Sequence, residues 1–205
     1  EDNISDESHI IGYSKDCSVA TRISYMVELS DGNYQRYEKQ DEYEKLYRVE
    51  QGTINRFIYT MIMPVTEQDM DKPGTSTVWN RKLIYQFQGG SGIGFRQGKA
   101  RLHRLFGRRQ EQLHQGYAVI SSTGNKTSYT YNMMLAEDTA RRVKMQFTSL
   151  YGEPEYTVGI GGSGGGLSQY LIGQNSTGIL DAAIPLYSYP DMISQTPVSY
   201  THLTL

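Results

Sequence analysis

From Lys82 onward, short apolar runs alternate with stretches of helical periodicity, and this alternation limits the folds open to the chain. Apolar residues in 132–151 recur at steps of three and four, which predicts an amphipathic helix, and 167–173 predicts a second one. Six segments have strand-like patterns: 22–29, 55–63, 82–87, 117–121, 156–160 and 181–187. Pro64 is expected to end the second strand, and the charged stretch 34–48 to be a surface connection. The sequence therefore predicts an α/β fold, with a mostly parallel sheet flanked by helices and antiparallel strands at its N-terminal edge.

Charge and hydropathy exclude several classes of protein. The 205 residues carry 20 basic and 22 acidic side chains, a net charge of −2. So small a charge gives no global field to hold a polyanion, so we expect no nucleic-acid partner. No run approaches the roughly 20 apolar residues that a membrane-spanning helix needs, so we expect no membrane association. Cys17 is the only cysteine, which excludes an internal disulfide and a thiolate zinc site formed by this chain alone.

The segment 161–165 reads Gly-Gly-Ser-Gly-Gly and matches the motif G-x-S-x-G between a predicted strand and a predicted helix. A nucleophile in such a tight turn has strained backbone geometry, and glycine neighbours avoid clashes of Cβ atoms. Ser163 is therefore the candidate nucleophile. The N–H of Gly164, at the start of the helix, is a candidate donor to the oxyanion that forms when the serine attacks a carbonyl.

A second oxyanion donor is expected in the glycine-rich loop after the strand 82–87. Enzymes with a G-x-S-x-G nucleophile keep an HGGG-type loop after the corresponding strand. Gly89 and Gly90 occupy that place here, with Gln88 at the position of the histidine. The alternative is that these glycines form only a structural turn.

Two other interpretations of the serine motif remain open. The composition of 161–166 is that of a flexible linker, although a strand and a helix are expected directly beside it. Gly159, Gly161 and Gly164 also spell G-x-G-x-x-G, the fingerprint of a dinucleotide-binding unit, which would make the protein a nucleotide-dependent oxidoreductase. That fingerprint requires an acid at the end of the next strand, whereas Asp181 stands at its beginning.

A serine nucleophile needs a histidine base and usually a carboxylate, which in these hydrolases follow the serine in the sequence. The histidines His9, His103 and His114 precede Ser163. His202 lies in the segment 197–205, which is expected to be a non-native tail. We therefore expect the base to be encoded beyond residue 196. Asp191 is a possible acid, although a turn or cap role is the more common use of such a residue.

A cluster of basic residues follows the first glycine-rich loop. Its members are Arg96, Lys99, Arg101, Arg104, Arg108 and Arg109. They could bind an anionic ligand, but charged residues of this kind more often form a solvated face.

Three stretches resemble a family of secreted α/β-hydrolases related to tannase and feruloyl-esterase-like enzymes and to hydroxybutyrate-oligomer hydrolases. They are 49–56, 87–98, and 161–165 continuing to 180–181 and 187–192. The resemblance implies an incomplete α/β-hydrolase fold, a Ser–Asp/Glu–His mechanism with Ser163 as nucleophile, and a secreted or periplasmic protein. The second half of the catalytic domain is then absent from this sequence.

On this interpretation, residues 47–196 are the N-terminal part of the catalytic domain, and 1–46 are an extension or edge strands. Residues 197–205 resemble a translated sequencing adapter and are expected to be a non-native tail, the alternative being a native strand. The expected substrate is a small-molecule or oligomeric ester, and the chemistry requires no cofactor and no metal. A non-catalytic ligand-binding protein remains an alternative, since 17 tyrosines could stack on sugars or aryl groups.

Overall fold

The computed structural model describes residues 15–40, 42–70, 72, 74, 76–90 and 96–189. Within these residues the strands are β1 (Arg22–Glu28), β2 (Tyr34–Arg36), β3 (Lys45–Ile54), β4 (Phe57–Val65), β5 (Lys82–Gln88), β6 (Ala118–Lys126), β7 (Tyr156–Gly162) and β8 (Ala182–Leu186). The α-helices are α1 (Leu102–His114), α2 (Met133–Tyr151) and α3 (Gly164–Asn175), and short 3₁₀ turns occur at Lys15–Cys17 and Glu67–Asp69. None of these helices combines the length and apolar character needed to cross a membrane.

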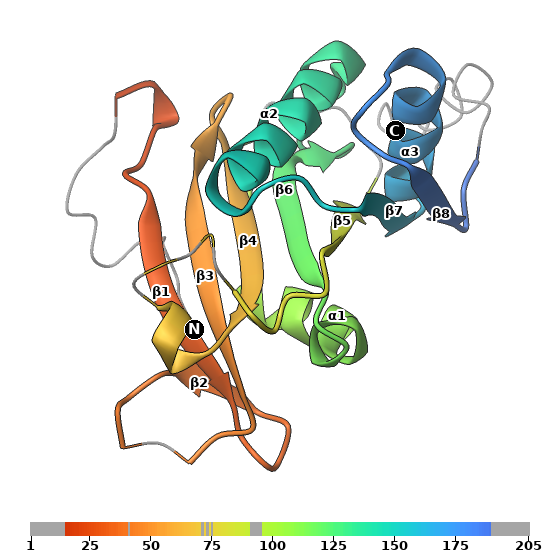
Figure 1. Ribbon diagram of the computed structural model, residues 1–205. Coiled ribbons are helices and arrows are strands. Elements are labelled where there is room, and N and C mark those ends of the chain that lie inside the picture. Colours follow the sequence, from red (N-terminus) through yellow and green to blue (C-terminus); the bar gives the residue numbers. More distant parts are fainter. Residues whose placement is uncertain are drawn as a thin grey trace.

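The strands form one mixed sheet in the order β2-β1-β3-β4-β6-β5-β7-β8. β6, β5, β7 and β8 are parallel to one another, and the four N-terminal strands continue the sheet with antiparallel pairings. Helices α2 and α3 cover one face and α1 covers the other (Figure 1). Because the carboxyl ends of parallel strands meet at one edge, the segments that follow β5, β6 and β7 lie close together there.

Two apolar clusters fill the space between the sheet and its helices. The cluster on the α2 face contains alternate strand residues and the buried side of α2: Met61, Tyr85, Ile120, Val143 and Phe147. The cluster on the α1 face contains the intervening strand residues and the buried side of α1: Ile62, Ile84, Val119, Phe106 and Leu113. The central strands are therefore apolar on both faces, which explains their continuous apolar runs.

A buried ion pair lies within the antiparallel half of the sheet. Arg48 and Glu50 on β3 are only 4% and 2% exposed, and their side chains pair at 3.2 Å. The second carboxylate oxygen of Glu50 accepts from the Tyr59 hydroxyl at 3.0 Å and from Gln146 at 3.2 Å. Arg48 also donates to the hydroxyl of Tyr151 at the end of α2. Both charges are thus compensated by groups of the protein.

The predicted α/β fold class is confirmed, and two local predictions are wrong. The segment 34–48 contains β2 and the beginning of β3, where Leu46, Tyr47 and Arg48 are buried and Arg48 pairs with Glu50. Pro64 does not end β4, which continues to Val65. A missing N–H is tolerated there because β6 pairs with β4 only between Tyr59 and Ile62. The sequence pattern also did not define α1, whose buried side is interrupted by charged residues.

Candidate active site

Ser163 occupies the turn between β7 and α3, at the carboxyl edge of the parallel strands. Its backbone has φ 56° and ψ −124°, a conformation that residues with a Cβ atom rarely adopt. The turn is held on both sides, since the Ser163 N–H donates to the carbonyl of Leu186 at 2.8 Å, and the Ser163 carbonyl accepts from Gly166 at 2.9 Å and Leu167 at 3.1 Å. The glycines of 161–166 belong to β7 and α3, which contradicts the flexible-linker interpretation.

The glycines around Ser163 allow three backbone segments to approach closely. A Cβ atom on Gly89, just after β5, would lie 2.6 Å from the carbonyl oxygen of Gly162 and 3.4 Å from Cβ of Ser163. A Cβ atom on Gly164 would collide with the hydroxyl of Thr127 and the carbonyl of Gly90. The loop after β5 and the first turn of α3 are therefore in contact.

The backbone N–H groups of Gly89, Gly90 and Gly164 belong to the segments that meet at this contact. Among the hydrogen bonds of the described residues, none uses the N–H of Gly89, Gly90 or Gly164. Thr127, which follows β6, donates its hydroxyl to the carbonyl of Gly90 and so fixes this loop. The sequence analysis did not identify Thr127, and nothing in the local pattern of residues 123–130 distinguishes it from other turn residues.

Gln169 is a second residue that sequence reasoning missed. It is 1% exposed, and its amide nitrogen donates to the carbonyls of Gly161 at 3.2 Å and Gly165 at 2.8 Å. Its oxygen accepts from the N–H of Ile184 at 3.1 Å. One side chain thus connects β7, α3 and β8 and holds the Ser163 turn in place. A glutamine on the buried side of a glycine-rich helix is the only signal that could have indicated this role.

The described histidines, His103 and His114, lie on α1. Neither of them lines the cavity that opens beside the Ser163 turn and is described below. His114 pairs with the buried carboxylate of Glu28 on β1 at 2.6 Å, and His103 is exposed. His9, His202 and Asp191, which were weighed as site residues, lie outside the described residues, as does the predicted tail at 197–205.

Asp181 has a structural position that disfavours the dinucleotide interpretation. Its carboxylate accepts from the N–H of Thr157 at 2.7 Å, and its own N–H donates to the carbonyl of Thr157. Both residues stand at the amino ends of β7 and β8, opposite to the edge where Gly164 lies. The acid that would bind a ribose is therefore not beside the glycines that would bind the pyrophosphate.

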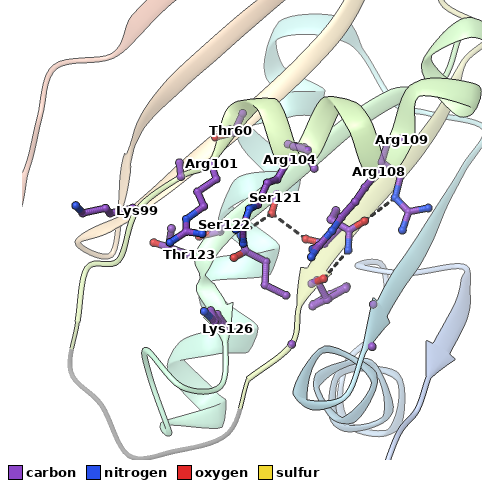
Figure 2. Close-up of a pocket in the computed structure, with 18 of the residues that line it drawn as sticks. Thr60, Lys99, Arg101, Arg104, Arg108, Arg109, Ser121, Ser122, Thr123 and Lys126 are labelled. Atoms are coloured by element: carbon purple, nitrogen blue, oxygen red, sulfur yellow. Dashed lines mark hydrogen bonds between the residues drawn. The ribbon is translucent and has the colours of Figure 1, made fainter. Parts of the chain in front are cut away.

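A cavity of about 510 Å³ opens beside the Ser163 turn, on the α1 face of the carboxyl edge (Figure 2). Its wall includes Gly89 and the two residues that precede Ser163, Gly161 and Gly162. Its cationic residues are Lys99, Arg101, Arg104, Arg108, Arg109 and Lys126. Arg109 donates to Gln86 at 2.5 Å, and its burial, then the nearby Arg108, lower the pKa of its guanidinium. Five of the six basic residues singled out in the sequence thus surround one cavity.

The strand order, the helices on both faces and the glycine-bounded turn after β7 define the class of the protein, an α/β-hydrolase-fold protein. The chain belongs to the tannase-like family of unknown function DUF6351, which it matches over residues 5–205. The predicted relationship to tannase-like proteins is thereby confirmed. No curated protein matches the sequence.

Several solved structures are similar to the chain. The α/β-hydrolase MGS-M1, from a Medee basin deep-sea metagenome library, is 18% identical with a TM-score of 0.48, over 69% of this chain and 57% of that one. The carboxylesterase Cest-2923 of Lactobacillus plantarum is 16% identical with a TM-score of 0.46, over 73% and 62%. The cell-wall-degrading esterase LipA of Xanthomonas oryzae is 12% identical with a TM-score of 0.40, over 84% and 50%. The chain spans less than two thirds of the length of each.

Proposed function

We propose that the full-length protein is a serine esterase that cleaves carboxylic esters through an acyl-enzyme on Ser163. The observation that carries the proposal is the backbone of Ser163, whose φ of 56° puts a serine in a glycine-like conformation at the N-terminus of α3. Backbone strain of this kind persists where the surrounding structure enforces it, and it is concentrated at functional sites. The turn would therefore act as a nucleophile elbow.

The reaction follows from the groups around this turn. Ser163 Oγ forms a bond to the ester carbonyl carbon and gives its proton to a base, and the carbonyl oxygen becomes an oxyanion. The N–H of Gly164 and those of Gly89 and Gly90 would donate to that oxyanion. The C–O bond to the alcohol then breaks as the base returns the proton to the leaving oxygen. Water hydrolyses the acyl-enzyme by the same steps in reverse order.

The remaining parts of the proposal concern groups and partners beyond the described residues. We place the histidine base and its carboxylate in parts of the protein other than those described, as the order of these residues in α/β-hydrolases implies. The substrate would be a small-molecule or oligomeric ester. Family membership supports the further proposal that the protein is secreted or periplasmic.

The test is hydrolysis of short-chain p-nitrophenyl esters by the full-length protein, with the Ser163→Ala variant assayed beside it. We expect turnover by the wild type and a loss of at least about a thousandfold in kcat for the variant, because triad nucleophiles contribute that much or more. Circular dichroism and thermal unfolding would verify that the variant is folded.

Two results would contradict the proposal. Turnover retained by Ser163→Ala would show that another group is the nucleophile. Absence of turnover in both proteins, together with a rise in Tm on adding NAD or NADP, would favour the oxidoreductase alternative, since a ligand of the native state raises its stability.

A further inference from the structure

The cavity beside Ser163 is cationic throughout. Six Lys and Arg residues line it, and among its described lining residues there is no Asp or Glu. None of these six side chains takes part in the salt bridges found among the described residues. Elsewhere in the chain, arginines on helices have acidic partners, as Arg141 and Arg142 do on α2. The cavity thus concentrates positive charge that the described protein leaves uncompensated.

The arrangement on α1 opposes the intrinsic preferences of a helix. Arg101, the N-cap residue of α1, is followed at steps of three and four by Arg104 and Arg108 on one side of the helix, and Figure 2 shows these side chains extending toward the labelled residues of β6. Like charges at this spacing repel one another. The N-terminus of a helix is itself positive, and the first turn of α1 contains no acid that would offset it. An anion bound between these groups would offset both the repulsion between the arginines and the positive charge of the helix N-terminus.

The opposite wall of the cavity is suited to an anion as well. Lys126 contributes a further cation to it, whereas the buried Ser121 and Thr123 at the end of β6 donate their hydroxyls to the carbonyls of Gln86 and Gln97. Arg109 is anchored by its Nε on the side chain of Gln86, which leaves its terminal N–H groups for a ligand. Guanidinium groups fixed in this way bind carboxylates and phosphates through paired hydrogen bonds.

The cavity borders the proposed reaction centre, because its wall includes Gly89, a proposed oxyanion donor, and Gly161 and Gly162, which precede Ser163. An acyl or alcohol portion that extends from an ester carbonyl at Ser163 past Gly89 and Gly162 would enter this cavity. We infer that this cavity is a subsite for a negatively charged group of the ester substrate, a carboxylate or a phosphate. The inference rests on the proposed function, since it defines the substrate class of the same site.

A matched pair of esters tests this directly on the full-length protein. One is 4-nitrophenyl hydrogen suberate, whose terminal carboxylate is too far along the chain to attack its own ester carbonyl readily, and the other is its neutral methyl ester. We expect kcat/KM to be about tenfold or more higher for the anionic ester, as charge-assisted hydrogen bonds of this kind provide. The preference should decrease as ionic strength rises, because exposed charges are screened.

The variant Arg104→Gln/Arg108→Gln removes two exposed charges without touching the Ser163 turn. We expect it to lose most of the preference for the anionic ester and to hydrolyse the neutral ester at the wild-type rate. Arg142→Gln, an exposed arginine on α2 at the other face of the sheet, is the control and should change neither rate. An equal loss for both esters in the double variant would overturn the inference.

Inhibition and binding measurements separate the remaining outcomes. Suberate and inorganic phosphate are tested as competitive inhibitors of neutral-ester hydrolysis, and the tighter of the two identifies which anion the site prefers. If neutral esters are hydrolysed with dependence on Ser163 and neither anion is favoured, the inference is wrong while the proposed function stands. If no ester is hydrolysed, calorimetric titration with the same anions still decides it: binding that the double variant loses supports the subsite, and no binding overturns it.

Discussion

The backbone of Ser163 leads to a prediction that separates catalytic from structural requirements at one position. Ser163→Ala and Ser163→Gly both remove the hydroxyl, which caps no N–H of α3, so its loss affects both variants equally. Only glycine also removes the Cβ atom that makes a φ of 56° unfavourable. We therefore expect Ser163→Gly to be more stable than Ser163→Ala, and both to lack esterase activity.

The size of the effect follows from two opposing contributions to the free energy of unfolding. A non-glycine residue in a sparsely populated backbone region costs about 1–3 kcal/mol, which glycine would recover. Glycine also gives the unfolded chain more conformational freedom, which destabilises the native state by about 0.4–1 kcal/mol relative to alanine. The net gain of Ser163→Gly over Ser163→Ala is therefore about 0.5–2 kcal/mol. For a domain of this size that corresponds to roughly 1–8 °C in Tm.

Thermal and urea unfolding of the two variants measure this difference, and Ser149 on α2 provides the matched control. Ser149 is exposed in an ordinary helical segment, where glycine is less favourable than alanine by about 1 kcal/mol. The order of stability should consequently be reversed between the two sites. If glycine is the less stable substitution at both, the turn stores no strain and the reasoning is refuted.

Two further predictions concern the buried pair and the oxyanion glycines. Glu50→Ala leaves the charge of Arg48 buried without a partner and should lower the free energy of unfolding by about 3–5 kcal/mol in urea titrations, an effect that Arg48→Met in the same protein should partly reverse. Gly164→Ala forces its new Cβ against Thr127, and we expect kcat to decrease about a hundredfold, since small displacements at a reaction centre have effects of this size. Gly173→Ala, whose new Cβ would have no atom within 4 Å, should leave kcat unchanged, and an equal loss in both glycine variants would contradict this explanation.

The strand, turn and helix around Ser163 could be predicted from the sequence because the information is local. Consecutive glycines directly after an apolar run fit few structures other than a tight turn entering a helix. In the structure β7 continues to Gly162 and α3 begins at Gly164. Of the glycine-rich segment 161–166, only Ser163 therefore lies between the strand and the helix. The proximity of Gly89 could be anticipated as well, since both segments follow parallel strands.

The N-terminal strand β3 could not be predicted for the opposite reason. Arg48 and Glu50 interrupt its apolar pattern, and charged residues are by default exposed. Their burial depends on Tyr151, which is 103 residues away from Arg48, and on Gln146. No window of local sequence contains these partners. Thr127 and Gln169 were missed for the same reason, because each acts through a contact with the backbone of another segment.

For the basic residues of α1, local sequence predicts a shared face of a helix, and only the tertiary structure shows what that face lies against. Their spacing places Arg104 and Arg108 on one side of a helix, but a solvated face and an anion site have the same spacing. What distinguishes the two is the opposite wall, where Lys126 adds a further cation and no acid occurs among the described lining residues. Because α1 precedes β6 and runs antiparallel to it, the N-terminus of the helix lies at the carboxyl edge of the sheet, where Ser163 also lies. The crossover that forms the sheet thus brings an electropositive helix end to the proposed nucleophile. The proposal of a negatively charged ester as substrate rests on this arrangement.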